Sequence, residues 1–132
     1  MHRTFPAVVV ACGVLVGLAA CKDENNPIIP DIVFPDSAVS YVAHVQPLFN
    51  QACALAGCHD DGPHQSPLRL TSYAGVMDPQ LLVVIPGDTL NSRLAMRITG
   101  RIPPQMPLNR PPLSQNQIHG ILTWIQEGAR PD

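Results

Sequence analysis

Proline is the residue that most constrains the fold of this chain, because fifteen of its 132 residues are proline. A proline fixes φ and has no N–H, so it interrupts helices and is excluded from the interior of sheets. The chain is therefore predicted to form short helices separated by stiff loops. Only 5% of the residues are aromatic, which leaves little bulk for a core. A domain this small usually needs a disulfide, a metal or a cofactor to stabilise it.

The first twenty residues have the pattern of an export signal. A basic start precedes an apolar run from Phe5 to Ala20, and these sixteen residues are fewer than the roughly 20 that span a bilayer. The run ends in LAAC, Leu18 to Cys21, which resembles the lipobox of bacterial lipoproteins. In such proteins cleavage leaves the cysteine at the N-terminus with lipid on its sulfur. We therefore expect residues 1–20 to be a lipoprotein signal peptide and Cys21 to be lipidated. An ordinary signal peptide with a chance cysteine is the alternative.

Export also sets the expected location and partners. The signal predicts that the mature chain lies on the periplasmic side of a bacterial membrane or at the outer membrane, held there by its lipid. Residues 21–38 contain three prolines and isolated apolar residues, which is typical of an extended tether, and residues 39–132 form the predicted single domain. Eight Lys and Arg stand against ten Asp and Glu without a basic stripe, so nucleic acid is not an expected partner.

Two helices are predicted at the ends of this domain. In YVAHVQPLFNQA, residues 41–52, apolar residues recur every three or four positions, and Pro47 either stands in the first helical turn or kinks the helix. In SQNQIHGILTWIQEG, residues 114–128, Ser114 begins a capping-box pattern, an apolar stripe follows, and Gly128 is the expected stop.

The stretch between these helices is predicted to be only partly regular. One short helix is expected within residues 68–77, capped by Thr71 or Ser72, and another within residues 91–100, capped by Asn91 or Ser92 and closed by Gly100. Residues 101–112 hold five prolines and cannot form a regular element. The predicted fold class is therefore all-α, with three to five short helices and long Pro-rich loops.

The sequence CALAGCH, Cys53 to His59, is the feature that points to chemistry. Zinc in a structural site takes four protein ligands, whereas here two thiols and one imidazole cluster. His64 could complete the set, but the spacing fits no common zinc module. A Cys53–Cys58 disulfide forms easily in an exported chain, although it closes only a short loop and leaves His59 without a role.

The third alternative is haem bonded to the chain through thioethers, whose usual motif is C-x-x-C-H. The second thioether holds the backbone at the ring edge, so that the next side chain, here His59, can reach the iron. This chain keeps the adjacency of Cys58 and His59 but has four residues between the cysteines. Because the porphyrin fixes the distance between its vinyl groups, the extra residues have to bulge outward, which Gly57 and its small neighbours allow.

Iron in an electron carrier usually has a sixth ligand, and this ligand is often methionine. Met77 and Met96 lie in expected helices among apolar residues, where methionine commonly fills a core. Met106 stands in PPQMP, and a loop braced by prolines holds a side chain in place at low entropic cost. Met106 is therefore the expected ligand, and covering a hydrophobic groove is its alternative role. The remaining histidines are weaker candidates for the iron: His44, His64 and His119.

Residues 40–130 resemble bacterial single-haem cytochrome c domains of the planctomycete type. The resemblance lies in YVAHVQPLFNQACALAGCH, LRLTSYAGVM, VIPGDTLNSRLAMRITG, PPQMPLNRPPLSQNQI and WIQEGA. It implies a small cytochrome c-like fold around one covalent haem, with thioethers on Cys53 and Cys58. It also implies His59 as the proximal iron ligand and Met106 as the distal one. The four-residue gap between the cysteines departs from the family pattern.

The expected function is one-electron transfer, because iron with two axial ligands changes its oxidation state but has no open position for a substrate. We therefore expect an electron carrier and not an enzyme, with haem c and its iron as cofactor and a redox protein as partner. A lipid-tethered binding module with a Cys53–Cys58 disulfide and no haem is the alternative. Haem catalysis or ligand sensing is a third hypothesis, and it requires Met106 to dissociate.

Overall fold

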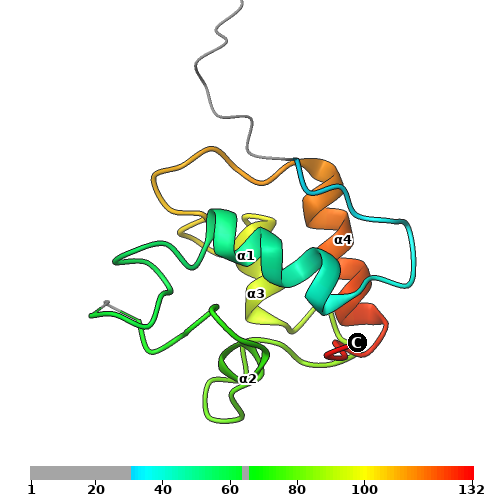
Figure 1. Cartoon of the computed structure of the whole chain (residues 1–132), viewed down its shortest axis with the longest axis horizontal. Helices are drawn as coiled ribbons and strands as arrows, with labels where there is room; N and C mark the ends of the chain where they lie inside the picture. The colour runs from blue at the N-terminus through cyan, green and yellow to red at the C-terminus, as the bar shows by residue number, and fades with distance from the viewer. Residues whose placement is uncertain (1–30, 64–65) are drawn as a thin grey trace, which may run out of the picture.

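The structure, a computed structural model, describes residues 31–63 and 66–132. Its elements are η1 (Tyr41–Val45, a π-helical turn), α1 (Gln46–Ala52), α2 (Tyr73–Val76), α3 (Arg93–Ile98) and α4 (Gln115–Gln126) (Figure 1). No strand occurs in these two stretches, so the prediction of an all-α protein is confirmed for them. No helix among the described residues is long and apolar enough to cross a membrane.

The first helix widens into a π turn just before Pro47. The side chain of Ser40 caps this turn by accepting from the Ala43 N–H at 2.9 Å. The Gln46 N–H then bonds to the carbonyl of Tyr41, five residues back, and Pro47 follows as the second residue of α1. Because Pro47 has no N–H and its ring crowds the carbonyl four residues back, a wider turn at this point removes the conflict. The prediction that Pro47 stands in the first turn of a helix is thus confirmed.

The C-terminal helix α4 follows the predicted pattern most closely. Gln117 N–H donates to Ser114 Oγ at 3.2 Å, and Gln117 Oε1 accepts from the Ser114 N–H at 2.9 Å, which completes the capping box. Gly128 ends the helix with φ of +101°, a conformation that glycine adopts without strain. Along one face the helix buries Ile118, Ile121, Trp124 and Ile125.

The two middle helices are shorter than predicted. Ser72 caps α2 as expected, accepting from the Gly75 N–H at 3.3 Å. Ser92 precedes α3 but does not cap it, because its hydroxyl donates instead to the Asp88 carbonyl at 2.6 Å. The Ile85 N–H donates to the same hydroxyl at 2.8 Å, so Ser92 ties the preceding turn to the start of α3. Residues 101–112 form no regular element, as predicted.

The core lies where α4 packs against η1 and α3. Trp124 is 1% exposed, and its ring lies 5.5 Å from that of Tyr41, which in turn lies 5.1 Å from the ring of Tyr73. The Trp124 Nε1–H donates to the Arg130 carbonyl at 2.8 Å, so its polar atom is satisfied. Trp124 therefore serves packing in this fold, and Phe49 in the same core is fully buried.

The packed body begins before Val39, the predicted start of the domain. Phe34 is 3% exposed and sits on Gly120 of α4, where a Cβ atom would lie 2.1 Å from its ring. The Phe34 N–H donates to Asn116 Oδ1 at 2.8 Å, and the Phe34 carbonyl accepts from Asn116 Nδ2 at 3.0 Å. The C-terminal part of the predicted tether, residues 31–38, thus lies along the domain. Residues 1–30, with the predicted signal peptide and Cys21, lie outside the described residues.

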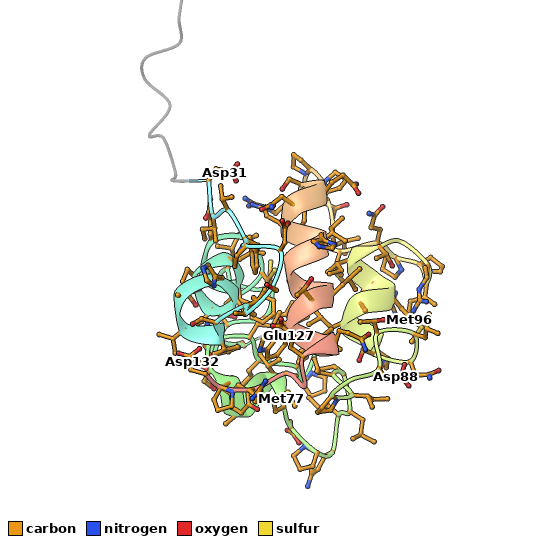
Figure 2. All side chains as sticks on the ribbon, turned by 90° about the vertical axis from the view of Figure 1, so that its right-hand side faces the viewer. Asp31, Met77, Asp88, Met96, Glu127 and Asp132 are labelled. Atoms are coloured by element: carbon orange, nitrogen blue, oxygen red, sulfur yellow. The ribbon has the colours of Figure 1, made fainter. Side chains whose placement is uncertain are left out.

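Two C-terminal carboxylates hold the segment that enters η1 (Figure 2). Glu127 accepts from the N–H groups of Ala38 at 2.7 Å and Val39 at 3.0 Å. Asp132 accepts from Ser40 Oγ at 2.6 Å and from the Val42 N–H at 3.2 Å. The bonds from Val39 and Ala38 lower the pKa of the Glu127 carboxyl group. The pKa of Asp132 is lowered chiefly by the bond from Ser40.

Candidate functional site

The cysteine–histidine motif forms a closed turn at the end of α1. The Cys53 N–H makes the last helical bond, to the Phe49 carbonyl at 2.8 Å. The Cys58 N–H then bonds to the Leu55 carbonyl at 2.8 Å, and Gly57 has φ of +77°, as the third residue of a type II turn requires. The His59 N–H bonds back to the Cys53 carbonyl at 3.2 Å. The four residues between the cysteines therefore bulge outward, while the two ends of the motif stay together.

The two cysteines have different surroundings. Cys53 is 9% exposed, and burial, together with the nearby Cys58, raises the pKa of its thiol to about 12. The positive charge of Arg110 opposes this shift and lowers the pKa of the Cys53 thiol. Cys58 is exposed, and both sulfurs are free thiols rather than partners in a disulfide. At neutral pH Cys53 is thus a neutral thiol at the edge of the core.

His59 is oriented by a backbone carbonyl nine residues further along the chain. Its Nδ1 lies 3.1 Å from the Leu68 carbonyl oxygen. A carbonyl only accepts, so Nδ1 carries the hydrogen and Nε2 keeps a lone pair. The Leu70 N–H donates to the His59 carbonyl at 2.9 Å, which fixes the backbone as well. In the neutral imidazole this tautomer leaves Nε2 as the ring nitrogen that could bind a metal.

The residues after the motif are tied to the same returning segment. Asp61 accepts from Thr71 Oγ1 at 2.9 Å and lies 3.6 Å from Arg69 Nη1. Arg69 also reaches the Asp60 carbonyl at 3.4 Å. These bonds join residues 60–61 to residues 69–71, next to the Leu68 carbonyl that bonds to the His59 ring.

The Pro-rich loop that carries Met106 is anchored to α3. The Met106 N–H donates to the Arg97 carbonyl at 3.0 Å, and Arg97 Nη1 donates to the Pro104 carbonyl at 3.2 Å. Met106 is half-buried. Figure 1 shows this loop beside the C-terminal end of α1, where Cys53 lies, and the electrostatic effect of Arg110 on that cysteine agrees with the view. The fold thus brings the loop of Met106 to the cysteine–histidine motif.

The other candidate ligands have ordinary surroundings or lie outside the described residues. Met77 packs half-buried against the core at the end of α2, and Met96 is half-buried in α3 (Figure 2). His44 accepts from the Ser40 N–H at Nδ1 with a distance of 3.1 Å, and His119 is exposed on α4. His64 is not among the described residues.

Two surface hollows lie away from the cysteine–histidine motif. Both hollows lie along the C-terminal half of α4, one beside Trp124 and Arg130 and the other beside His119 and Thr123. Neither is lined by residues of the motif. Among residues 31–63 and 66–132, no three His, Cys, Asp or Glu side chains are grouped so that they could hold a metal ion.

Sequence reasoning did not identify three contributors to this site. The carbonyl of Leu68 carries no sequence signal, because every residue has one. Arg69 and Thr71 bond to Asp60 and Asp61, and Arg110 affects Cys53. Only the fold reveals these contacts. Compared with family models, curated proteins and solved structures, the chain has no match.

Proposed function

We propose that the chain is a c-type cytochrome, tethered to a membrane through Cys21, that passes single electrons to and from a protein partner. In this proposal Cys53 and Cys58 carry the thioethers, His59 is the proximal iron ligand and Met106 is the distal one. The covalently bound haem supplies iron that changes between two oxidation states. The domain is then a small cytochrome c-like fold, a finer description than the all-α class.

The observation that carries the proposal is the hydrogen bond between His59 Nδ1 and the Leu68 carbonyl, at 3.1 Å. A histidine that binds a metal commonly donates its other ring N–H to a carbonyl or carboxylate, which sets the tautomer and the direction of the ring. His59 has this second bond, and it follows directly after a cysteine. A disulfide between Cys53 and Cys58 gives no reason for such an orientation.

The geometry of the motif also fits two attachment points. The bond between the His59 N–H and the Cys53 carbonyl, at 3.2 Å, keeps both ends of the motif together despite the two additional residues. Gly57 lies in the outward bulge, and no atom lies within 4 Å of where its Cβ would be. Cys53 faces the core and Cys58 faces solvent, so the chain offers one buried and one accessible thiol for attachment.

The anchored loop of Met106 favours an electron carrier over a catalyst. Its backbone is bonded to Arg97, and its neighbouring prolines restrict the loop further. Held on such a loop, Met106 would stay on the iron of the haem and would leave no place there for a substrate or a small gas. We therefore expect His59 and Met106 to hold the iron in both oxidation states.

The test is the mass and the spectrum of the exported protein, made in a host that has haem-attachment machinery. We expect the mass of one haem above that of the lipidated polypeptide, sharp visible bands after reduction, and colour that stays with the chain in a denaturing gel. Cys53→Ala and Cys58→Ala should each lower the covalent haem content. A colourless protein whose Cys53 and Cys58 are joined by a disulfide would refute the proposal and favour the binding module.

The distal ligand has its own test with a matched control. Met106→Leu should allow the reduced protein to bind carbon monoxide rapidly, whereas Met96→Leu, in a half-buried helical position, should leave it as slow as in the parent. Rapid binding by the parent protein would instead favour ligand sensing or catalysis.

A further inference from the structure

Charges are unevenly distributed along the described chain. Between Thr89 and Gln126 the sequence has four arginines and no acidic residue. The rest of the described chain has eight acidic residues and only two arginines, Arg69 and Arg130. The protein is thus close to neutral as a whole but positive over one segment, which consists of α3, the loop of Met106 and α4.

Three of the four arginines lie on α3 or just after it. Arg93 and Arg97 are four residues apart within α3, the spacing that places side chains on one face of a helix. Arg101 follows Gly100, whose φ of +75° turns the chain out of the helix, and the Arg101 guanidinium returns to donate to the Leu90 carbonyl at 2.6 Å. The fourth, Arg110, lies on the loop that returns toward Cys53. We call these four residues, with the 52% exposed Leu108 between them in the chain, the arginine surface.

The charges of the arginine surface are not neutralised by ion pairs. The only ion pair among the described residues joins Arg69 to Asp61, away from this surface. Arg97 and Arg101 donate to uncharged backbone carbonyls, which hold the guanidinium groups in position while other N–H donors stay free. Arg101 has an electrostatic effect on Asp88, a carboxylate that is already bonded to Asn91. The surface is thus positive and pre-organised for an anionic partner.

We infer that the arginine surface, formed by Arg93, Arg97, Arg101 and Arg110 around Leu108, is where an acidic redox protein docks. The inference rests on the proposed electron transfer, because this surface includes the loop that holds Met106. Positive charge around the point of electron exit steers an acidic partner and sets its orientation. A protein partner is favoured over an anionic membrane, because a bilayer lying on this surface would cover the same exit. Asp61 is a poorer docking group than these arginines, because it already contacts Thr71 and Arg69.

The first test uses small redox reagents of opposite charge in place of the unidentified partner. Arg93→Gln combined with Arg110→Gln removes two charges from side chains that make no hydrogen bond within the described chain, and Arg130→Gln is a matched control outside the surface. At low ionic strength the double variant should react with hexacyanoferrate on the order of fivefold more slowly, and added salt should reduce the difference. Its rate with cationic hexaammineruthenium should not fall. An unchanged hexacyanoferrate rate, or an equal loss in Arg130→Gln, would overturn the inference.

The second test needs no haem, so it separates this inference from the proposed function. Labelled poly-glutamate should bind the parent protein at low salt, and the Arg93→Gln, Arg110→Gln variant should bind it on the order of tenfold more weakly. For the membrane, the lipidated protein is compared on phosphatidylcholine vesicles with and without phosphatidylglycerol, where the lipid anchor contributes equally. A strong preference for anionic vesicles, with no affinity for poly-glutamate, would overturn the protein partner in favour of a membrane. Absence of haem with binding intact would refute only the proposed function.

Discussion

The contact between Phe34 and Gly120 decides whether Gly120→Ala stabilises or destabilises the protein. Gly120 lies in the middle of α4, where glycine is about 1 kcal/mol less favourable than alanine. Without the fold, Gly120→Ala would therefore be expected to stabilise the helix. A Cβ at this position would lie 2.1 Å from ring atoms of Phe34, far inside van der Waals contact. Phe34 would then have to leave its site.

The cost of displacing Phe34 can be worked from its burial. Phe34 is 3% exposed, and losing a buried phenylalanine from a core costs about 3–5 kcal/mol. Subtracting about 1 kcal/mol for the better helix former leaves a loss of about 2–4 kcal/mol in the free energy of unfolding. The two backbone bonds to Asn116 would weaken with it, which adds to the loss.

A double-mutant cycle in urea tests this reasoning. In the parent, Gly120→Ala should lower the free energy of unfolding by about 2–4 kcal/mol. In a Phe34→Gly background the same change should be neutral or stabilising by up to about 1 kcal/mol, because both the ring and the Phe34 Cβ, which would lie 2.4 Å from the new Cβ, are gone. An equal loss in both backgrounds would show that Phe34 does not pack on Gly120. In the proposed tethered protein, release of Phe34 would free residues 31–38 to lengthen the tether.

Three further outcomes follow from the caps, the turn and the C-terminal carboxylates. Ser114→Ala should lower the free energy of unfolding by about 1 kcal/mol in urea, because the capping box of α4 is lost; Ser114→Asp should recover most of it. Gly57→Ala should cost about 1 kcal/mol, from its φ of +77° alone, and Gly57→Asn should cost less; an equal cost for both would contradict the conformational explanation. Glu127 and Asp132 have lowered pKa values, so their contribution to stability is present above their unfolded pKa values of roughly 4 and is lost as the pH falls through the folded ones. Melting temperature should therefore drop below pH 4, and Glu127→Gln should flatten that part of the profile.

The features that depend on neighbours in the chain were predicted well. The capping box at Ser114, the stop at Gly128 and the irregular loop at residues 101–112 all agree with the structure. Each depends on residues within one or two helical turns, so the sequence contains all the information. Ser92 shows the limit of this reasoning. It occupies the predicted position before α3, but its hydroxyl donates to the Asp88 carbonyl in the preceding turn and does not cap the helix.

The candidate site divides in the same way. Cys53, Cys58, His59 and Met106 could be selected as candidates because their residue types and spacing limit the chemistry they perform. Their surroundings could not be predicted, because they arise where distant segments meet: the Leu68 carbonyl at His59, and Arg110 near Cys53. Such contacts leave no periodicity or spacing in the chain. Local pattern thus specified which residues have chemistry to offer, whereas packing determined the orientation of the His59 ring, the burial that raises the pKa of the Cys53 thiol and the place of Phe34 in the core.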